Sequence, residues 1–294
     1  MLRRDLPANN GNPKDGEEGT MVSELKMTVL SDNIADPPLT AEWGLSILLE
    51  ADGRQILLDT GGGTAFASNA LALGMDLSAV DVGVLSHAHY DHADGLEAFF
   101  ELNSRASFLI RQGFGENCFG RKEGGMTYIG VRRGLMKAWA SRITPVSGVY
   151  EISPDVLLVP HRTKDYSAIA LRGGLYVERA GNYLPDDFAH EQSLLIQTPQ
   201  GAVIFNSCSH TGPENILRDV EELAGRTEVC AYVGGLHLFM LTDEELHAVC
   251  RQLKESSVRR FFTGHCTGDH AFEVLREELG DRICQFRAGF RQMF

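Results

Sequence analysis

The stretch HAHYDH, residues 87–92, places three imidazoles and one carboxylate within six consecutive positions. The apolar run 82–85 before it predicts a buried strand, and Leu96, Phe99 and Phe100 after it predict a packed helix. The cluster is therefore expected on a loop that leads from a strand into a helix. Lone histidines are common on polar surface loops, but this density of ligand groups favours a metal site.

The residue types in this cluster suit divalent transition metals. Imidazole nitrogen binds zinc, iron and manganese, and a carboxylate adds a harder oxygen ligand. Alternate residues of an extended segment project to the same side. His87 and His89 are therefore predicted to share one ion, while Asp91 and His92 face a second one.

Beyond the cluster, short apolar segments alternate with amphipathic ones, which predicts an α/β protein. Thr242 followed by Glu245 predicts a capping box at a helix start, and Gly280 predicts a helix end. The predicted strands cover about 27–30, 45–50, 55–59, 82–85, 193–197, 202–205, 229–233 and 260–262. Helices are expected at about 213–223, up to residue 253, and after residue 262.

Residues 1–20 are polar and rich in Gly, Asn and Pro, which predicts a disordered tail and makes Met21 a candidate start. The remainder, 21–294, is predicted to be one domain. Residues 111–134 are rich in glycine and show no clear period. This segment is expected to be a mobile lid or a substrate loop, and its Phe114, Tyr128 and Arg132 are expected to help to choose the substrate.

Composition restricts the partners and the compartment. The formal net charge of −13 disfavours a nucleic-acid partner and favours a small-molecule substrate. Six cysteines are scattered through predicted strands and helices, which argues against a disulfide framework and favours a reducing cytoplasm. Neither a secretory signal nor a membrane span is expected.

The string His-x-His-x-Asp-His resembles the signature of the metallo-β-lactamase superfamily. The resemblance implies an αββα sandwich, in which two mixed β-sheets pack face to face between outer helices. Within the superfamily the chain is similar to the 7,8-dihydropterin-6-methyl-4-(β-D-ribofuranosyl)aminobenzene 5′-phosphate synthases and related metal-dependent hydrolases. The matching stretches are 41–45, 58–61, 85–95, 191–195, 208–212, 234–238 and 265–268.

The resemblance implies one or two divalent ions, with zinc expected first and manganese or iron as alternatives. It also implies two further ligands on loops after later strands. His210 and His265 are the candidates, because each follows an apolar strand. The metal ligands are thus predicted to be His87, His89, Asp91, His92, His210 and His265.

One feature departs from the family pattern. Many members carry a bridging aspartate after the strand that here ends at Asn206, and no carboxylate stands there. Either Cys208 contributes a thiolate, or solvent alone joins the metals, or one site is weak. Asp187, His190 and Glu191 lie where other members place a histidine ligand, so they are reserve candidates.

Several residues have two possible roles. Asp59 in the family lies near the metals, so it could accept an N–H from a ligand imidazole, or it could simply begin the glycine turn 61–63. His237 could be a general acid, could orient a substrate phosphate, or could be structural. Cys266 could be a ligand but is favoured as a small buried residue. His161, His247 and His270 are predicted to be surface or helix-face residues.

A divalent ion lowers the pKa of bound water, so the expected function is hydrolysis by a metal-activated hydroxide. The substrate is expected to be a small phosphoester, thioester or lactone, with a phosphate-containing molecule favoured. Asp91 is expected to orient the water and His237 to protonate the leaving group. Two alternatives stay open: a transferase that resembles the dihydropterin synthases, and a protein that senses a metabolite without turning it over.

Overall fold

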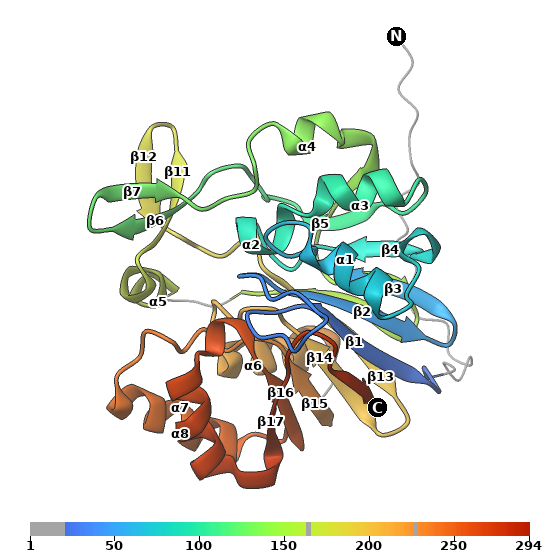
Figure 1. Ribbon diagram of the computed structural model, residues 1–294. Helices are drawn as coiled ribbons and strands as arrows, with labels where there is room; N and C mark the ends of the chain where they lie inside the picture. The colour runs from blue at the N-terminus through green and yellow to red at the C-terminus, as the bar shows by residue number, and fades with distance from the viewer. Residues whose placement is uncertain (1–20, 163–165, 226–227) are drawn as a thin grey trace.

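The computed structural model describes residues 21–162, 166–225 and 228–294. The tail predicted at residues 1–20 lies outside this range. Among the described residues the strands form three sheets, two of seven strands and one of four. The two large sheets pack face to face and carry the fold (Figure 1).

The first large sheet contains both chain ends of the described domain and the strand that precedes the histidine cluster. Its order is β18 (Arg291–Met293), β1 (Leu25–Ser31), β2 (Ser46–Ala51), β3 (Arg54–Leu58), β4 (Val82–Val84), β5 (Phe108–Arg111) and β8 (Ile143–Val146). Its pairs are antiparallel from β18 to β3 and parallel from β3 to β8.

The second large sheet is built from the later part of the chain. Its order is β17 (Ile283–Gln285), β16 (Arg260–Thr263), β15 (Val229–Val233), β14 (Gly201–Phe205), β13 (Gln192–Thr198), β10 (Val156–Pro160) and β9 (Tyr150–Ser153). The pairs from β14 to β17 are parallel and the others antiparallel. Both sheets are therefore mixed.

The main core lies between the two sheets. Val29 and Ile47 of the first sheet pack in one cluster with Leu158, Val203 and Val233 of the second. The central strands are buried on both faces because helices cover the outer faces, so their sequences are nearly continuous apolar runs. This explains why the strands were visible in the sequence without strict alternation.

Helices form the two outer layers (Figure 1). Helices α1 (Ala65–Ala72), α2 (Tyr90–Ala93), α3 (Leu96–Leu102) and α4 (Leu135–Ala138) pack on the first sheet. Helices α6 (Pro213–Ala224), α7 (Asp243–Glu255) and α8 (Asp269–Leu279) follow strands of the second. Separate apolar clusters join each helix layer to its own sheet. The predicted αββα sandwich of two mixed sheets is thus confirmed. No helix in the described part of the chain is long and apolar enough to cross a membrane.

The predicted helix signals are also confirmed. Thr242 and Glu245 form a reciprocal capping box at the start of α7, and Gly280 follows α8 with a positive φ of 56°. Strand β15 spans the predicted residues, and β14 and α6 agree with prediction to within one residue at each end. The local periodicity of the last third was therefore sufficient to place its elements.

Residues 111–134, expected as a mobile lid or substrate loop without clear period, contain regular secondary structure. Strands β6 (Cys118–Lys122) and β7 (Gly125–Tyr128) form a hairpin that pairs with β11 (Leu175–Arg179) and β12 (Asn182–Pro185) in the four-stranded sheet. This small sheet stands apart from the large ones, next to α5 (Tyr166–Gly173) (Figure 1). Backbone hydrogen bonds from Tyr90 to Ile129 and from Val131 to Ala88 fix it to the histidine loop.

Close backbone packing makes Gly234, after β15, indispensable. Its φ is +138°, and a Cβ there would lie 1.8 Å from the carbonyl oxygen of Asn206. We expect Gly234→Ala to lower the free energy of unfolding by about 3 kcal/mol, because the neighbouring β14 end cannot move aside. Urea denaturation measures this, with Gly113→Ala as the control.

Gly113 also has a positive φ, of +101°, but a Cβ there meets nothing within 4 Å. Its replacement tests the cost of the backbone conformation alone. Equal losses in the two variants would contradict the steric explanation for Gly234.

Candidate metal centre

The carboxyl ends of five strands meet at one edge of the sandwich. Strands β3 and β4 of the first sheet and β14, β15 and β16 of the second deliver their loops there. These loops and α2 carry every residue predicted as a ligand. The six side chains are buried and lie close together in two sets.

The first set consists of His87, His89 and His210. The Nε2 atoms of His87 and His210 are 3.2 Å apart. The ring of His89 lies 4.7 Å from each of the other two rings. The ring of His89 therefore lies beside those of His87 and His210, while its ligand nitrogen groups with Cys118, Asp186 and His190.

The second set consists of Asp91, His92 and His265. The Nε2 atoms of His92 and His265 are 3.2 Å apart, and Asp91 Oδ2 lies 3.5 Å from His265 Nε2 and 3.9 Å from His92 Nε2. This set combines two imidazoles with a carboxylate, as the sequence predicted.

Cys208 lies between the two sets. Its Sγ is 3.2 Å from His92 Nε2. It also lies within 4.8 Å of a ring nitrogen of His87, His210, His92 and His265. Of the three possibilities for the missing aspartate, the structure places the thiol where it can reach both sets. Cys266 is buried behind it and donates to the Cys208 carbonyl at 3.6 Å.

Hydrogen bonds fix the ring tautomers of three histidines so that Nε2 is free to bind a cation. Ser86 Oγ donates to Asp59 at 2.6 Å. The hydroxyl oxygen of Ser86 can therefore accept the N–H of His87 Nδ1, at 2.7 Å. His92 Nδ1 donates to Asp59 at 2.8 Å, and His265 Nδ1 donates to Asn33 Oδ1 at 3.0 Å. Such partners on the far nitrogen are typical of metal-bound imidazoles.

The charge balance of the cluster also suits a bound cation. Burial, with the neighbouring imidazoles, holds the pKa of His87 and His210 well below the usual range and lowers that of His89 to about 3. These rings are therefore neutral and offer lone pairs. Burial lowers the pKa of His265, but Asp91 outweighs it and raises the pKa to about 9, so this position attracts positive charge. The residues thus fit divalent ions.

Asp59 supports the ligands, as one of its two predicted roles requires. It is fully buried directly after β3 and accepts from the Ser86 N–H at 2.7 Å as well as from Ser86 Oγ and His92. The carboxylate thus connects His87, through Ser86, with His92. It also occupies a turn with a φ of 59°, so the alternative role as a turn residue holds at the same time.

Glu191, a reserve ligand, instead holds the loop that carries His210. Its buried carboxylate accepts the backbone N–H of His210 at 2.9 Å and of Thr211 at 3.1 Å, and the Thr211 hydroxyl at 3.0 Å. Asp187 lies outside the cluster and accepts from Arg179 at 2.6 Å. The structure therefore brings neither carboxylate into the two ligand sets.

His190, the third reserve residue, lies behind His89 in a buried group with Cys118 and Asp186. Its Nδ1 accepts the Ala88 N–H at 3.2 Å, and its Nε2 donates to Asp186 at 3.1 Å. Cys118 belongs to β6, so this group connects the four-stranded sheet to the histidine loop. His89 is the fourth member of this group, with its ring 5.5 Å from that of His190, so His190 lies beside the first ligand set.

Backbone strain is concentrated at this edge. Asp59, Phe188, Ser209, His237 and His265 all have φ between 48° and 59°. Non-glycine residues in this region cost of order 1–3 kcal/mol each and are kept where surrounding structure requires them. The loops are thus held in conformations that place side chains at the cost of local stability.

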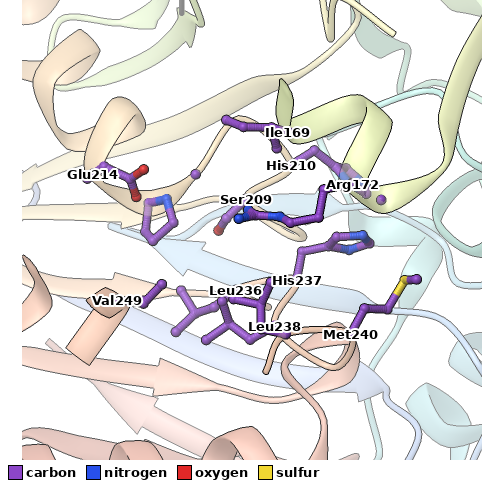
Figure 2. Close-up of a pocket in the computed structure, with 14 residues that line it drawn as sticks. Ile169, Arg172, Ser209, His210, Glu214, Leu236, His237, Leu238, Met240 and Val249 are labelled. Atoms are coloured by element: carbon purple, nitrogen blue, oxygen red, sulfur yellow. The ribbon is translucent and has the colours of Figure 1, made fainter. Parts of the chain in front are cut away.

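Two cavities flank the ligand sets. The first, of about 190 Å³, is lined by His210 and His237 together with Arg172 of α5. Figure 2 shows Arg172 entering from the α5 side, opposite Leu236 and Val249. The ring of His237 is 4.3 Å from that of His210, and its Nδ1 has no partner among the described residues. His237 is therefore beside the ligands and faces a cavity.

The second cavity, of about 250 Å³, is lined by His265, Trp43 and Phe239. Neither cavity is lined by Phe114, Tyr128 or Arg132, the predicted substrate residues. Tyr128 Oη donates to the Val131 carbonyl, and Arg132 pairs with Glu97 at 2.6 Å on the surface. The structure places none of the three against these cavities, and their expected role in substrate choice stays a prediction.

Sequence reasoning missed several supporting residues. Asp32 accepts the His265 N–H at 2.9 Å, and burial raises its pKa to about 6 despite that bond. Asn33 and Ser86 were also missed, although Ser86 directly precedes His87. His161 was predicted at the surface, but its side chain is buried and lies 3.1 Å from Ser193 Oγ. His247 and His270 are exposed, as predicted.

Comparison with known proteins agrees with this geometry. Residues 42–159 match the model of the metallo-beta-lactamase superfamily. Over 289 residues the chain is 27% identical to a 7,8-dihydropterin-6-methyl-4-(beta-D-ribofuranosyl)-aminobenzene-5'-phosphate synthase of Methanocaldococcus jannaschii, covering 91% of this chain and 96% of the relative.

Two solved structures are also similar. The crystal structure of a metal-dependent hydrolase of the beta-lactamase superfamily is 28% identical with a TM-score of 0.75, and the match covers 91% of this chain and 98% of that one. A diphosphatase from the PhnP family is 15% identical with a TM-score of 0.53, over 93% and 98% of the two chains, which shows the shared fold alone. Residues 42–159 therefore carry a metallo-β-lactamase domain, and the chain has the fold of that superfamily.

Proposed function

We propose that the chain is a metal-dependent hydrolase of small phosphate esters. The observation that supports this most directly is a buried cluster of imidazoles and Asp91 beside a cavity that contains Arg172. His87 lies with His210 and His89, and His92 lies with His265 and Asp91. Divalent ions held there supply Lewis acidity and a nucleophile at neutral pH. Zinc is expected first, since imidazole and thiolate ligands both suit it.

The protein's own groups can be assigned roles around a bound phosphate ester. Arg172, half-exposed at the cavity wall, provides a positive charge for the phosphate oxygens. Asp91 is placed to orient the attacking water, whose oxygen bonds to phosphorus as the ester P–O bond breaks. His237 is placed to give a proton to the departing oxygen.

The test combines metal analysis with three model substrates: bis-p-nitrophenyl phosphate, a lactone and a thioester. We expect the purified protein to contain transition metal and to cleave the phosphodiester fastest. Chelation should abolish this activity and zinc or manganese should restore it. Protein that holds no metal and does not respond to added metal would contradict the proposal.

The role of His237 can be tested separately. We expect His237→Ala to lower kcat by about a hundredfold and to leave the amount of bound metal unchanged, because a general acid takes part in the chemical step and not in metal binding. His247→Ala, on the exposed side of α7, is the matched control and should have no effect. Loss of metal in the His237 variant would show that this residue is instead part of the metal site.

A transferase is the second candidate, because the Methanocaldococcus relative is named a synthase. In that case the metals would stabilise a diphosphate leaving group while an aromatic carbon of the acceptor attacks the methylene group of the pterin. Release of diphosphate from a pterin diphosphate ester only when an aromatic acceptor is added would favour this candidate. Hydrolysis at the same rate without the acceptor would favour the hydrolase.

A further inference from the structure

We propose that Trp43 and Phe239 form an aromatic subsite that binds a planar ring of the substrate next to the metal centre. The proposal rests on the proposed function, since it names the class of molecule that the same site takes. It commits to phosphate diesters in which the ester group that is not cleaved carries an aromatic ring.

The two aromatic side chains lie together at the mouth of the second cavity. Each is 47% exposed, although both are large and apolar. Their ring centroids are 6.2 Å apart with an interplanar angle of 79°. An exposed pair of this kind, on the wall of a cavity, offers apolar surface that a flat ligand can cover.

The pair is in direct contact with the catalytic edge. The ring of Trp43 lies 5.2 Å from that of the candidate ligand His265, and the ring of Phe239 lies 5.2 Å from that of His237. Trp43, Phe239 and His265 line the second cavity. A ring held by the pair is therefore next to any phosphate ester that reaches the metals.

The backbone holds both residues in place before a ligand arrives. Gly44, after Trp43, is so close to the metal loop that a Cβ would lie 2.5 Å from the Asp91 carbonyl oxygen, and Leu45 N–H donates to that oxygen at 3.2 Å. A Cβ on Gly268 would lie 2.7 Å from Phe239 Cβ. Little conformational entropy is thus lost when a ring binds.

The first test compares two substrates with the same leaving group, bis-p-nitrophenyl phosphate and methyl p-nitrophenyl phosphate. They differ in whether the second ester group is a ring or a methyl group. We expect Trp43→Ala to reduce the preference for the diaryl ester, as a ratio of kcat/KM values, by about tenfold. Trp43→Phe should retain most of the preference, because it keeps a ring.

Tyr183→Ala is the matched control. Tyr183 is 45% exposed on β12 of the four-stranded sheet and lines neither cavity. This variant should keep the wild-type preference. Equal losses on both substrates in Trp43→Ala would overturn the subsite, because a general structural defect does not distinguish a ring from a methyl group.

A binding measurement that needs no turnover separates this proposal from the proposed function. Trp139 is replaced by phenylalanine, so that Trp43 is the remaining tryptophan, and the metal-loaded protein is titrated with phenylphosphonate and methylphosphonate. We expect phenylphosphonate alone to change the Trp43 fluorescence. Such a change without hydrolysis of either ester would refute the hydrolase but support the subsite.

The remaining outcomes are equally decisive. Hydrolysis of both esters, without a fluorescence change and with a preference that Trp43→Ala leaves intact, would refute the subsite and support the hydrolase. An absence of both hydrolysis and fluorescence change would overturn both proposals.

Discussion

Replacement of His210 by alanine is expected to reduce phosphodiester hydrolysis by about a thousandfold and to lower the amount of bound metal. His210 completes the first ligand set, with its Nε2 3.2 Å from that of His87. Without His210, the neutral imidazoles of His87 and His89 remain for one ion, and Cys208 or solvent must take the missing ligand position. The measurements are kcat/KM and metal content after dialysis.

Controls for this variant address folding and position. His270→Ala removes an exposed histidine that pairs with Asp243 at 2.7 Å, and it should retain full activity and metal. Circular dichroism spectra of both variants should match the wild type. Unchanged metal content and turnover in His210→Ala would exclude this residue from the metal centre and would favour a different ligand set.

Replacement of Glu191 by alanine is expected to lower the free energy of unfolding of the metal-free protein by about 3–5 kcal/mol. The variant leaves three buried donors without their acceptor: the N–H groups of His210 and Thr211 and the Thr211 hydroxyl. The loop that carries His210 should then also bind metal more weakly. Urea denaturation in the presence of a chelator measures the first effect, and metal titration measures the second.

Glu222→Ala is the matched control, because Glu222 is exposed on α6 and removal of its charge should change stability by less than about 0.5 kcal/mol. Glu191→Gln keeps the size of the side chain and one acceptor oxygen, so a smaller loss is expected. A Glu191→Ala variant as stable as the control would show that water replaces the carboxylate without cost.

Local sequence was enough to predict most of the sandwich and the ligand cluster. Strands such as β15 have apolar runs bounded by glycine or polar residues, and α7 has a complete capping signal at Thr242. His210 and His265 were chosen as candidates because the resemblance implies ligands on loops after later strands, and each follows an apolar strand. The signals for these features all lie within a few residues of the feature itself.

The parts that could not be predicted depend on contacts between distant residues. The hairpin at residues 118–128 pairs with a segment about 50 residues later, and neither strand has a strong apolar pattern because the small sheet is partly exposed. The role of Glu191 depends on where the next loop returns, so its sequence position suggested a ligand. Trp43 and Phe239 are separated by most of the chain, and only folding shows that they meet.

Because the candidate ligands come from opposite sheets, ions bound there would also stabilise the assembled chain. His87 and His210 are 123 positions apart, and His92 and His265 are 173 apart. Each ion would therefore act as a reversible cross-link between the two halves, captured only after both have been assembled. Because a ligand that binds the native state alone adds stability in proportion to the logarithm of its concentration, the lifetime of this protein in the cell should follow the local supply of metal.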